Sequence, residues 1–549
     1  MKKQNSKKAV SVTLALLLSS TAVLAACSTQ DSKQAAPIAG ADSGKEGAQA
    51  KGPKPKITVS VYDRNNVPEG EGTITNNRWT KWINEKAPVQ VEFIPVPRTT
   101  STEKFNVMFA SGEAPDLIME FTNSYTKELA SKGQIIPLDE PIEKYSTTYK
   151  KFLKENPVIQ KSTLYNGKTY FFGRLLPFTP NHYLMIRKDW LDKLKLSVPK
   201  TTEEYLQTAK AFTEQDPDGN GKKDTLGTTF HDIEFFYQFD PATLSAYLLQ
   251  NDQYVRSWDR AKAVIDMKKK LYDAGTVDKD IFADKTGAKT QQDWVNGKLG
   301  IYGSDNLEGV KGYSVFETLK KNNPSAEVMV LPMPKSEFGQ FAPATSTPIQ
   351  FNAAINATAK NVEAVIKYVD WLVSEETQNT LMFGFEGEHY KMENGCPKPI
   401  DAAKNKKELS WNGDYQMLSN TALLGKCAEF SNQLDPNKPL DKEYMKLIEQ
   451  GRAAYVSPDR PLHIEVLIPQ TLPDDLLVIN NTVKNTITNI YTKAVVGGSS
   501  YTVDQAMKDA MDAWDKAGGK KIDDFYAKSY TENKKDVVYT KDFYKYMQK

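Results

Sequence analysis

The chain has 549 residues, and its 71 basic and 69 acidic side chains nearly cancel. A near-neutral balance without a basic block gives no electrostatic reason to expect nucleic-acid binding. With 26% charged residues, no segment after the amino-terminal region is a candidate membrane span. The length suits two or three domain-sized units.

The amino-terminal 26 residues predict a lipoprotein signal peptide. Four lysines within the first eight residues precede an uncharged run, which Leu24-Ala25-Ala26-Cys27 closes. This order describes a secretory signal, and the run is too short and too polar for a spanning helix. The cysteine after small residues resembles a bacterial lipobox, so we expect Cys27 to carry acyl chains such as palmitate that hold the protein on the outer side of the cell membrane. The alternative is an ordinary cleaved signal with a coincidental cysteine.

Residues 27–56 predict a flexible tether between this anchor and the folded body. The stretch is rich in Ala, Gly, Ser, Gln and Lys and ends in Gly-Pro-Lys-Pro-Lys. It cannot bury enough apolar surface to offset its conformational entropy. Without the four signal lysines, the mature chain has a net charge of −2.

The body alternates predicted strands and helices. In the first part, strands are expected at 57–61, 89–94 and 116–121, with helices at 78–85 and 101–110. This spacing favours a parallel, wound sheet. Further strands are expected at 169–172, 183–186, 299–302, 328–331 and 349–355, and further helices at 188–195, 201–214, 360–374 and over most of 473–517.

Two cysteines remain after Cys27. Outside the cytoplasm, Cys396 and Cys427 can form a disulfide, and closing a loop of about 30 residues stabilises by about 3–4 kcal/mol in the chain-entropy model. The alternative is a pair of buried thiols.

The most specific local motif predicts a structural calcium site. Oxygen-bearing side chains recur at Asp216, Asp218, Asn220 and Asp224, and the Lys222 carbonyl falls where an EF-hand loop offers a backbone ligand. Hard oxygen donors at this spacing suit Ca²⁺, and crowded carboxylates need a cation. The pattern departs from a full EF-hand because its twelfth position holds a glycine. A polar turn without metal is the alternative.

Several motifs in order resemble one family. Ala110-Ser-Gly-Glu-Ala-Pro-Asp116, Met185-Ile-Arg-Lys-Asp-Trp190, Pro199-Lys-Thr-Thr-Glu-Glu-Tyr205 and the acidic loop are similar to segments of extracellular solute-binding proteins (family 1) of carbohydrate ABC importers, in the large Gram-positive lipoprotein branch. Asn296-Gly-Lys298 and the segment from Phe383 to Tyr390 match as well.

The resemblance implies an α/β fold of the two-lobed, type II periplasmic-binding-protein kind, with a wound sheet and flanking helices in each lobe. We expect lobe one to comprise 57–172 with 350–397, and lobe two 173–349 with 398–549. Such a monomeric receptor captures an oligosaccharide by hinge closure and delivers it to ABC permease subunits.

Sugars are bound by aromatic faces and by planar polar side chains. The predicted ligand contacts are Asn77, Arg78, Trp79, Glu120, Asn123, Tyr302, Asp305, Glu386, Tyr390 and Trp411. For Trp79, packing in the core is the alternative. Arg64, Arg78 and Arg174 could pair with the carboxylate of an acidic sugar.

Other functions are less well supported by the sequence. A receptor for peptide, metal or another small solute, a lipid-anchored adhesin and a surface glycoside hydrolase remain alternatives, but no local motif marks a carboxylate pair, a P-loop or a Gly-x-Ser-x-Gly elbow. The four histidines do not pair at zinc-site spacing either. The sequence therefore predicts a binding protein that does no covalent chemistry.

Overall fold

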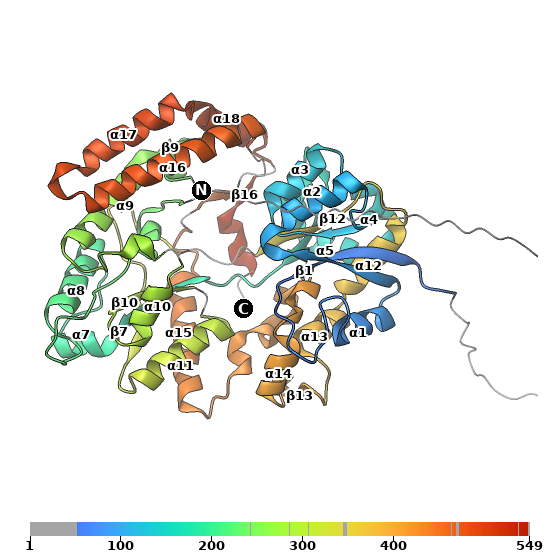
Figure 1. Ribbon diagram of the computed structural model, residues 1–549, viewed down its shortest axis with the longest axis horizontal. Coiled ribbons are helices and arrows are strands. Elements are labelled where there is room, and N and C mark those ends of the chain that lie inside the picture. Colours follow the sequence, from blue (N-terminus) through green and yellow to red (C-terminus); the bar gives the residue numbers. More distant parts are fainter. Residues whose placement is uncertain are drawn as a thin grey trace, which may run out of the picture. The chain divides into compact units, whose positions relative to one another are not determined.

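A computed structural model describes residues 52–241, 243–284, 286–305, 307–343, 348–462, 464–467, 472–535 and 537–546 (Figure 1). The predicted signal peptide and the lipid-anchor residue Cys27 lie outside these ranges, as does most of the tether. Within the described residues, every helix is too short or too polar to cross a membrane.

A five-stranded mixed sheet organises the first part of the chain. Its strands are β1 (Lys56–Asp63), β2 (Gln90–Pro97), β3 (Leu117–Met119), β6 (Phe172–Leu175) and β12 (Ile349–Ile355), in the order β2-β1-β3-β12-β6. β1 is parallel to β2 and β3, whereas β12 is antiparallel to β3 and β6. The carboxyl ends of the parallel strands therefore meet at one edge of the sheet, which is where wound sheets bind ligands.

Helices cover both faces of this sheet. α1 (Arg78–Lys86), α5 (Thr148–Glu155) and α12 (Val362–Leu372) share one core with it, and α2 (Ser101–Ser111) and α3 (Asn123–Ser131) share another. Successive residues of β3 alternate between these two cores, as the pleat of a strand requires. The strand–helix alternation predicted for this region is confirmed.

A second sheet has three strands in the order β10-β7-β11. β7 (His182–Arg187) lies between β10 (Ile301–Asp305) and β11 (Val328–Val330) and is antiparallel to both. A separate hydrophobic core surrounds it. The elements of this core include α7 (Lys188–Leu194), α8 (Thr202–Glu214), α9 (Trp258–Asp273), α10 (Ala288–Val295), α11 (Val310–Asn322), α15 (Pro439–Tyr455), α16 (Asp474–Val496) and α17 (Val503–Lys516).

The carboxyl-terminal helices complete this part. α16 packs against α17 and α9, and α18 (Lys520–Glu532) lies beside β9 (Gln253–Ser257) (Figure 1). The remaining elements are α4 (Asp139–Tyr145), α6 (Pro157–Ser162), α13 (Glu375–Phe383), α14 (Ala402–Leu409), β4 (Leu164–Tyr165), β5 (Lys168–Thr169), β8 (Ala246–Gln250), β13 (Tyr390–Glu393), β14 (Cys396–Pro399), β15 (Val466–Leu467) and β16 (Val538–Tyr539).

The local sequence fixes where helix α8 begins. The Thr201 hydroxyl accepts a hydrogen bond from the Glu204 backbone N–H, while the Glu204 carboxylate accepts one from the Thr201 N–H. This is the capping box that Thr-Thr-Glu-Glu predicts. It fixes the start of the helix that leads into the acidic loop at 216–224.

Two features tie the later chain to the five-stranded sheet. Trp411, Tyr415, Met417 and Leu418, which the sequence allocated to the second lobe, pack in the core that α1 and α12 share with that sheet. A disulfide joins Cys396 to Cys427, with Cα atoms 5.2 Å apart, and links the β13–β14 hairpin to the following turns. The two cysteines are therefore bonded in this structure and are not separate thiols.

Candidate functional site

Aromatic rings and guanidinium groups meet where β1, β2 and β3 end. Tyr62 stacks on Phe121 with ring centres 5.7 Å apart. The Arg98 guanidinium carbon lies 4.9 Å from the Tyr62 ring centre and 5.7 Å from that of Phe121, and the Arg174 carbon lies 5.6 Å from the Phe121 centre. We call these four residues the arginine edge. Its rings and charges come from four strands or strand ends of one sheet.

The two arginines of this edge have no carboxylate partner among the described residues. Arg174 donates to the Gln350 side-chain oxygen at 2.8 and 3.2 Å and to the Gln416 carbonyl at 3.1 Å, and both acceptors are neutral. Burial lowers the pKa of Arg174 to about 10. Arg98 has no hydrogen bond or ion pair within the described chain. Partly desolvated cations without counter-charges favour binding of an anion.

The other two candidate arginines are already neutralised. Arg64 makes a two-point contact with Asp414, at 2.7 and 2.9 Å, and this hydrogen bonding raises the pKa of Arg64. Arg78 pairs with Glu71 at 2.8 Å and with Glu408. These salt bridges hold distant segments together and leave less charge for a ligand. The predicted carboxylate role thus fits Arg174 better than Arg64 or Arg78.

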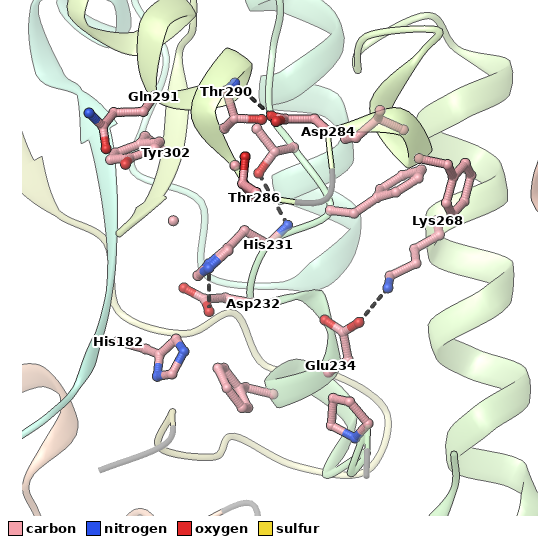
Figure 2. Close-up of a pocket in the computed structure, with 18 of the residues that line it drawn as sticks. His182, His231, Asp232, Glu234, Lys268, Asp284, Thr286, Thr290, Gln291 and Tyr302 are labelled. Carbon is pink, nitrogen blue, oxygen red and sulfur yellow. Dashed lines mark hydrogen bonds and ion pairs between the residues drawn. The ribbon is translucent and has the colours of Figure 1, made fainter. Parts of the chain in front are cut away.

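A pocket of about 550 Å³ with a mixed polar and apolar lining lies beside the three-stranded sheet (Figure 2). Tyr302 of β10 lines it and is braced from behind by Trp294, with ring centres 5.1 Å apart and planes 17° apart. Lys268 and Glu234 form an ion pair within the lining. The other polar groups of the lining include His182, His231, Asp232, Asp284, Thr286, Thr290, Gln291 and Lys311. Tyr302 itself is 7% exposed, but Phe230, Phe235 and Phe282 also line the pocket. Aromatic rings beside several donors and acceptors suit a hydroxylated ligand.

The acidic loop brings its predicted oxygen donors together. Asn220 is central, since its side-chain amide donates to Asp218 at 2.6 Å and to Asp224 at 3.1 Å. The Asp216 carboxylate accepts from the backbone N–H groups of Asn220 and Gly221. Partial burial and the neighbouring Asp216 carboxyl raise the pKa of Asp218. Three carboxyl groups that converge around Asn220 form an arrangement that a cation would stabilise.

Three predicted ligand contacts at the start of α1 have structural roles instead. The Asn77 side-chain oxygen caps the helix by accepting from the N–H groups of Trp79 and Thr80, and Asn77 is 2% exposed. The Trp79 indole is fully buried, stacks on Phe385 and donates to the Glu408 carbonyl at 3.0 Å. The packed ring leaves no face for a sugar, so the core alternative holds for Trp79 in this structure. Arg78 is committed to the ion pairs described above.

The four ligand contacts predicted at strand ends have different surroundings in the structure. Glu120 is buried and accepts hydrogen bonds from the Tyr62 hydroxyl and the Thr122 N–H, so it supports the arginine edge from within. Asn123 is exposed at the start of α3. Tyr302 lines the pocket, and Asp305 pairs with His182 across the β10–β7 ladder. Of these two predicted contacts, the structure places Tyr302 in the lining of the pocket.

The three candidates from the glycine-rich region, Glu386, Tyr390 and Trp411, neither belong to the arginine edge nor line the Tyr302 pocket. Glu386 is exposed, and its backbone forms an isolated β-bridge with Tyr390. Trp411 is 2% exposed, and its indole N–H donates to the Lys407 carbonyl at 3.0 Å. The buried indole serves the core of the five-stranded sheet and is not open to a ligand.

Sequence reasoning missed Arg98 and the pocket histidines. The available signal was the position of Arg98 four residues after the predicted strand at 89–94; in the structure it directly follows β2. His182 and His231 come from segments far apart in the chain, and no local pattern joins them.

The structure thus combines a mixed sheet that has charged and aromatic groups where its parallel strands end with a second, helix-flanked sheet that lines a pocket. The chain belongs to the bacterial extracellular solute-binding protein family, whose model matches residues 72–379. This is a family of binding proteins and not of enzymes.

Two relatives from Bacillus subtilis (strain 168) are similar over most of their length. The polygalacturonan/rhamnogalacturonan-binding protein YtcQ is 26% identical over 541 residues, which is 95% of this chain and 98% of the relative. Lipoprotein LipO is 24% identical over 80% of this chain and 86% of its own.

A solved structure of the Streptococcus pneumoniae ABC-transporter substrate-binding protein FusA, an EF-hand mutant in complex with fructo-nystose, superposes with a TM-score of 0.63 at 18% identity. The superposition covers 87% of this chain and 100% of the FusA chain. The likeness shows the predicted type II periplasmic-binding-protein-like fold.

Proposed function

We propose that this protein is a lipid-anchored receptor that binds acidic oligosaccharides and delivers them to the permease of an ABC importer. The observation that carries the acidic class is the arginine edge, where two guanidinium groups flank aromatic rings without a carboxylate partner in the described chain. The name of the relative YtcQ, which refers to a galacturonate polymer, supports the same class.

Each part of the site would have a distinct role. Rings such as Phe121 would stack on the C–H face of a sugar, while Arg98 and Arg174 bind its carboxylate. The pocket around Tyr302 would contact further hydroxyl groups. We propose that the lobes divide near residues 172 and 350 as predicted, but that the first lobe also includes residues 411–418, which pack in its core. Ligand contacts to both lobes would favour the closed form of a monomeric receptor.

Calorimetry and thermal denaturation with matched sugars test the ligand class. We expect an oligogalacturonide to bind the purified protein and, at a hundredfold excess over its dissociation constant, to stabilise it by about 2.7 kcal/mol. The methyl-esterified form of the same oligosaccharide should bind much more weakly, because it has lost the charge. Equal binding of both forms would contradict the acidic class, and binding of peptides alone would contradict a carbohydrate receptor.

We also propose that the acidic loop binds a structural calcium ion. The side-chain oxygens of Asp216, Asp218, Asn220 and Asp224 would hold it with the Lys222 carbonyl, and the Asn220 amide would turn its oxygen toward the ion. The positive charge of the ion would offset the mutual repulsion of the three carboxylates. Lys193 anchors the loop by donating to the Pro217 carbonyl at 2.9 Å. The EF-hand named for FusA is consistent with such a site.

Calcium should raise the melting temperature of the protein at neutral pH, and this gain should fall in acid. The gain falls in acid because the pKa of Asp218 is raised, so this carboxyl group holds its proton up to a higher pH. Calcium must displace that proton in order to bind. Melting curves with calcium or a chelator between pH 4.5 and 7.5 measure the effect. Asp218→Asn should abolish most of the gain, whereas the exposed Asp512→Asn should not. A calcium gain that is the same at all pH values would count against this assignment.

The anchor remains a proposal from the sequence. Cys27 would receive the lipid chains and hold the receptor at the outer face of the membrane. The name of the relative LipO agrees with a lipoprotein.

A further inference from the structure

Three side chains on one side of the pocket have the composition of a transition-metal site. His182, His231 and Asp232 each offer one donor atom, and these atoms all lie within 4.8 Å of one another. Figure 2 shows them together at the edge of the pocket, where His182 comes from β7 and the other two from the loop before Ile233. Two imidazoles and a carboxylate are ligands that suit zinc and similar ions.

Both imidazole rings are held in place. The His182 Nδ1 atom lies 2.7 Å from the Asn181 side-chain oxygen, a contact that orients the ring. Gly303 lies against His231, since a Cβ atom there would come within 2.4 Å of its Nδ1 atom. The Thr229 hydroxyl accepts a hydrogen bond from the His231 backbone N–H at 3.1 Å. These contacts pre-organise the donors before any ligand arrives.

Asp232 gives an independent indication of a cation. It is 4% exposed and has a left-handed backbone conformation, with φ of 69°. Its Oδ1 atom lies 2.9 Å from His231 Nδ1, whereas its buried Oδ2 atom has no hydrogen-bond partner in the described chain. An unsatisfied buried carboxylate oxygen is costly, and a metal ion would remove that cost. The nearby charge of Lys268 is already paired with Glu234.

We propose that His182, His231 and Asp232 bind a divalent transition-metal ion of the zinc class. Three protein ligands leave a coordination position for water or for an oxygen of a molecule in the pocket. The site is separate from the acidic loop, whose all-oxygen donors suit calcium. It does not depend on the identity of the sugar. Sequence spacing excluded it only because the donors come from separate segments.

Titration of the metal-free full-length protein with zinc chloride, followed by calorimetry and by metal analysis after desalting, tests this site. We expect one high-affinity equivalent. His182→Gln and His231→Gln should each weaken zinc binding by more than tenfold, and Asn181→Ala by about tenfold through loss of ring orientation. Lys81→Ala in α1 and Asp512→Asn in α17, neither of which lines the pocket, should leave it unchanged.

The visible spectrum of bound cobalt gives a second measurement, which reports the type of ligand atoms and not the binding affinity. Bound at this site, Co²⁺ should show visible absorption typical of nitrogen and oxygen ligation, and this absorption should be lost in folded His231→Gln protein. Failure to retain zinc would overturn the proposal. Unchanged zinc affinity in both histidine variants, or its loss in Lys81→Ala or Asp512→Asn, would do so as well.

Discussion

Removal of either arginine of the arginine edge is expected to weaken binding of an acidic oligosaccharide by about 10- to 100-fold. A hydrogen bond to a charged group contributes about 1.5–3 kcal/mol, and about 1.4 kcal/mol corresponds to a factor of ten. Arg174→Ala and Arg98→Ala should therefore act mainly on the charged ligand. Calorimetry with an oligogalacturonide and with its methyl ester measures the two affinities.

The controls separate loss of charge from loss of structure. Lys81→Ala removes an exposed cation from α1 and should change neither affinity. The acidic ligand should also lose affinity as salt is raised, because salt screens the attraction between exposed charges. If Arg174→Ala weakened the ester and the acid equally, its role would be to support Phe121 and not to bind the carboxylate. If neither variant changed the affinity for the acid, the arginine edge would not be the binding site.

The arginine edge shows how far sequence reasoning reaches. Alternating apolar residues predicted β1, β2 and β3, and strand–helix spacing predicted their parallel arrangement, so their ends could be placed at one edge. That argument led to Glu120 and Asn123 and, from charge, to Arg174. It could not show that Glu120 faces inward to Tyr62, nor that Arg64 is neutralised by Asp414, because the latter contact joins residues 350 positions apart.

The acidic loop could be predicted from the sequence, whereas the cluster of His182, His231 and Asp232 could not. All donors of the loop lie within nine consecutive residues, and local backbone geometry brings them together, so their convergence was predictable from 216–224 alone. His182, His231 and Asp232 meet only because β7, β10 and the loop before Ile233 pack against one another. Such a site depends on tertiary structure, which spacing in the sequence does not encode.

Trp79→Ala should lower the free energy of unfolding by about 3–5 kcal/mol, the usual range for removing a large buried aromatic side chain. The indole is fully buried, lies 5.6 Å from the Phe385 ring centre and 6.3 Å from that of Trp82, and donates a hydrogen bond to Glu408. Urea denaturation followed by circular dichroism measures the loss. Trp82→Phe is a matched control, since Trp82 is partly exposed and keeps an aromatic ring after substitution, so the loss should be smaller.

Sugar affinity of the folded Trp79→Ala protein decides between the two roles that the sequence left open for this residue. Because no face of the ring is available to a ligand, affinity measured well below the unfolding transition should stay within about threefold of the parent, a difference of less than about 1 kcal/mol. A variant with near-parental stability and strongly reduced affinity would instead mean that the start of α1 opens and that Trp79 contacts the sugar. Loss of stability with retained affinity would leave the arginine edge and the Tyr302 pocket as the surfaces that bind the ligand.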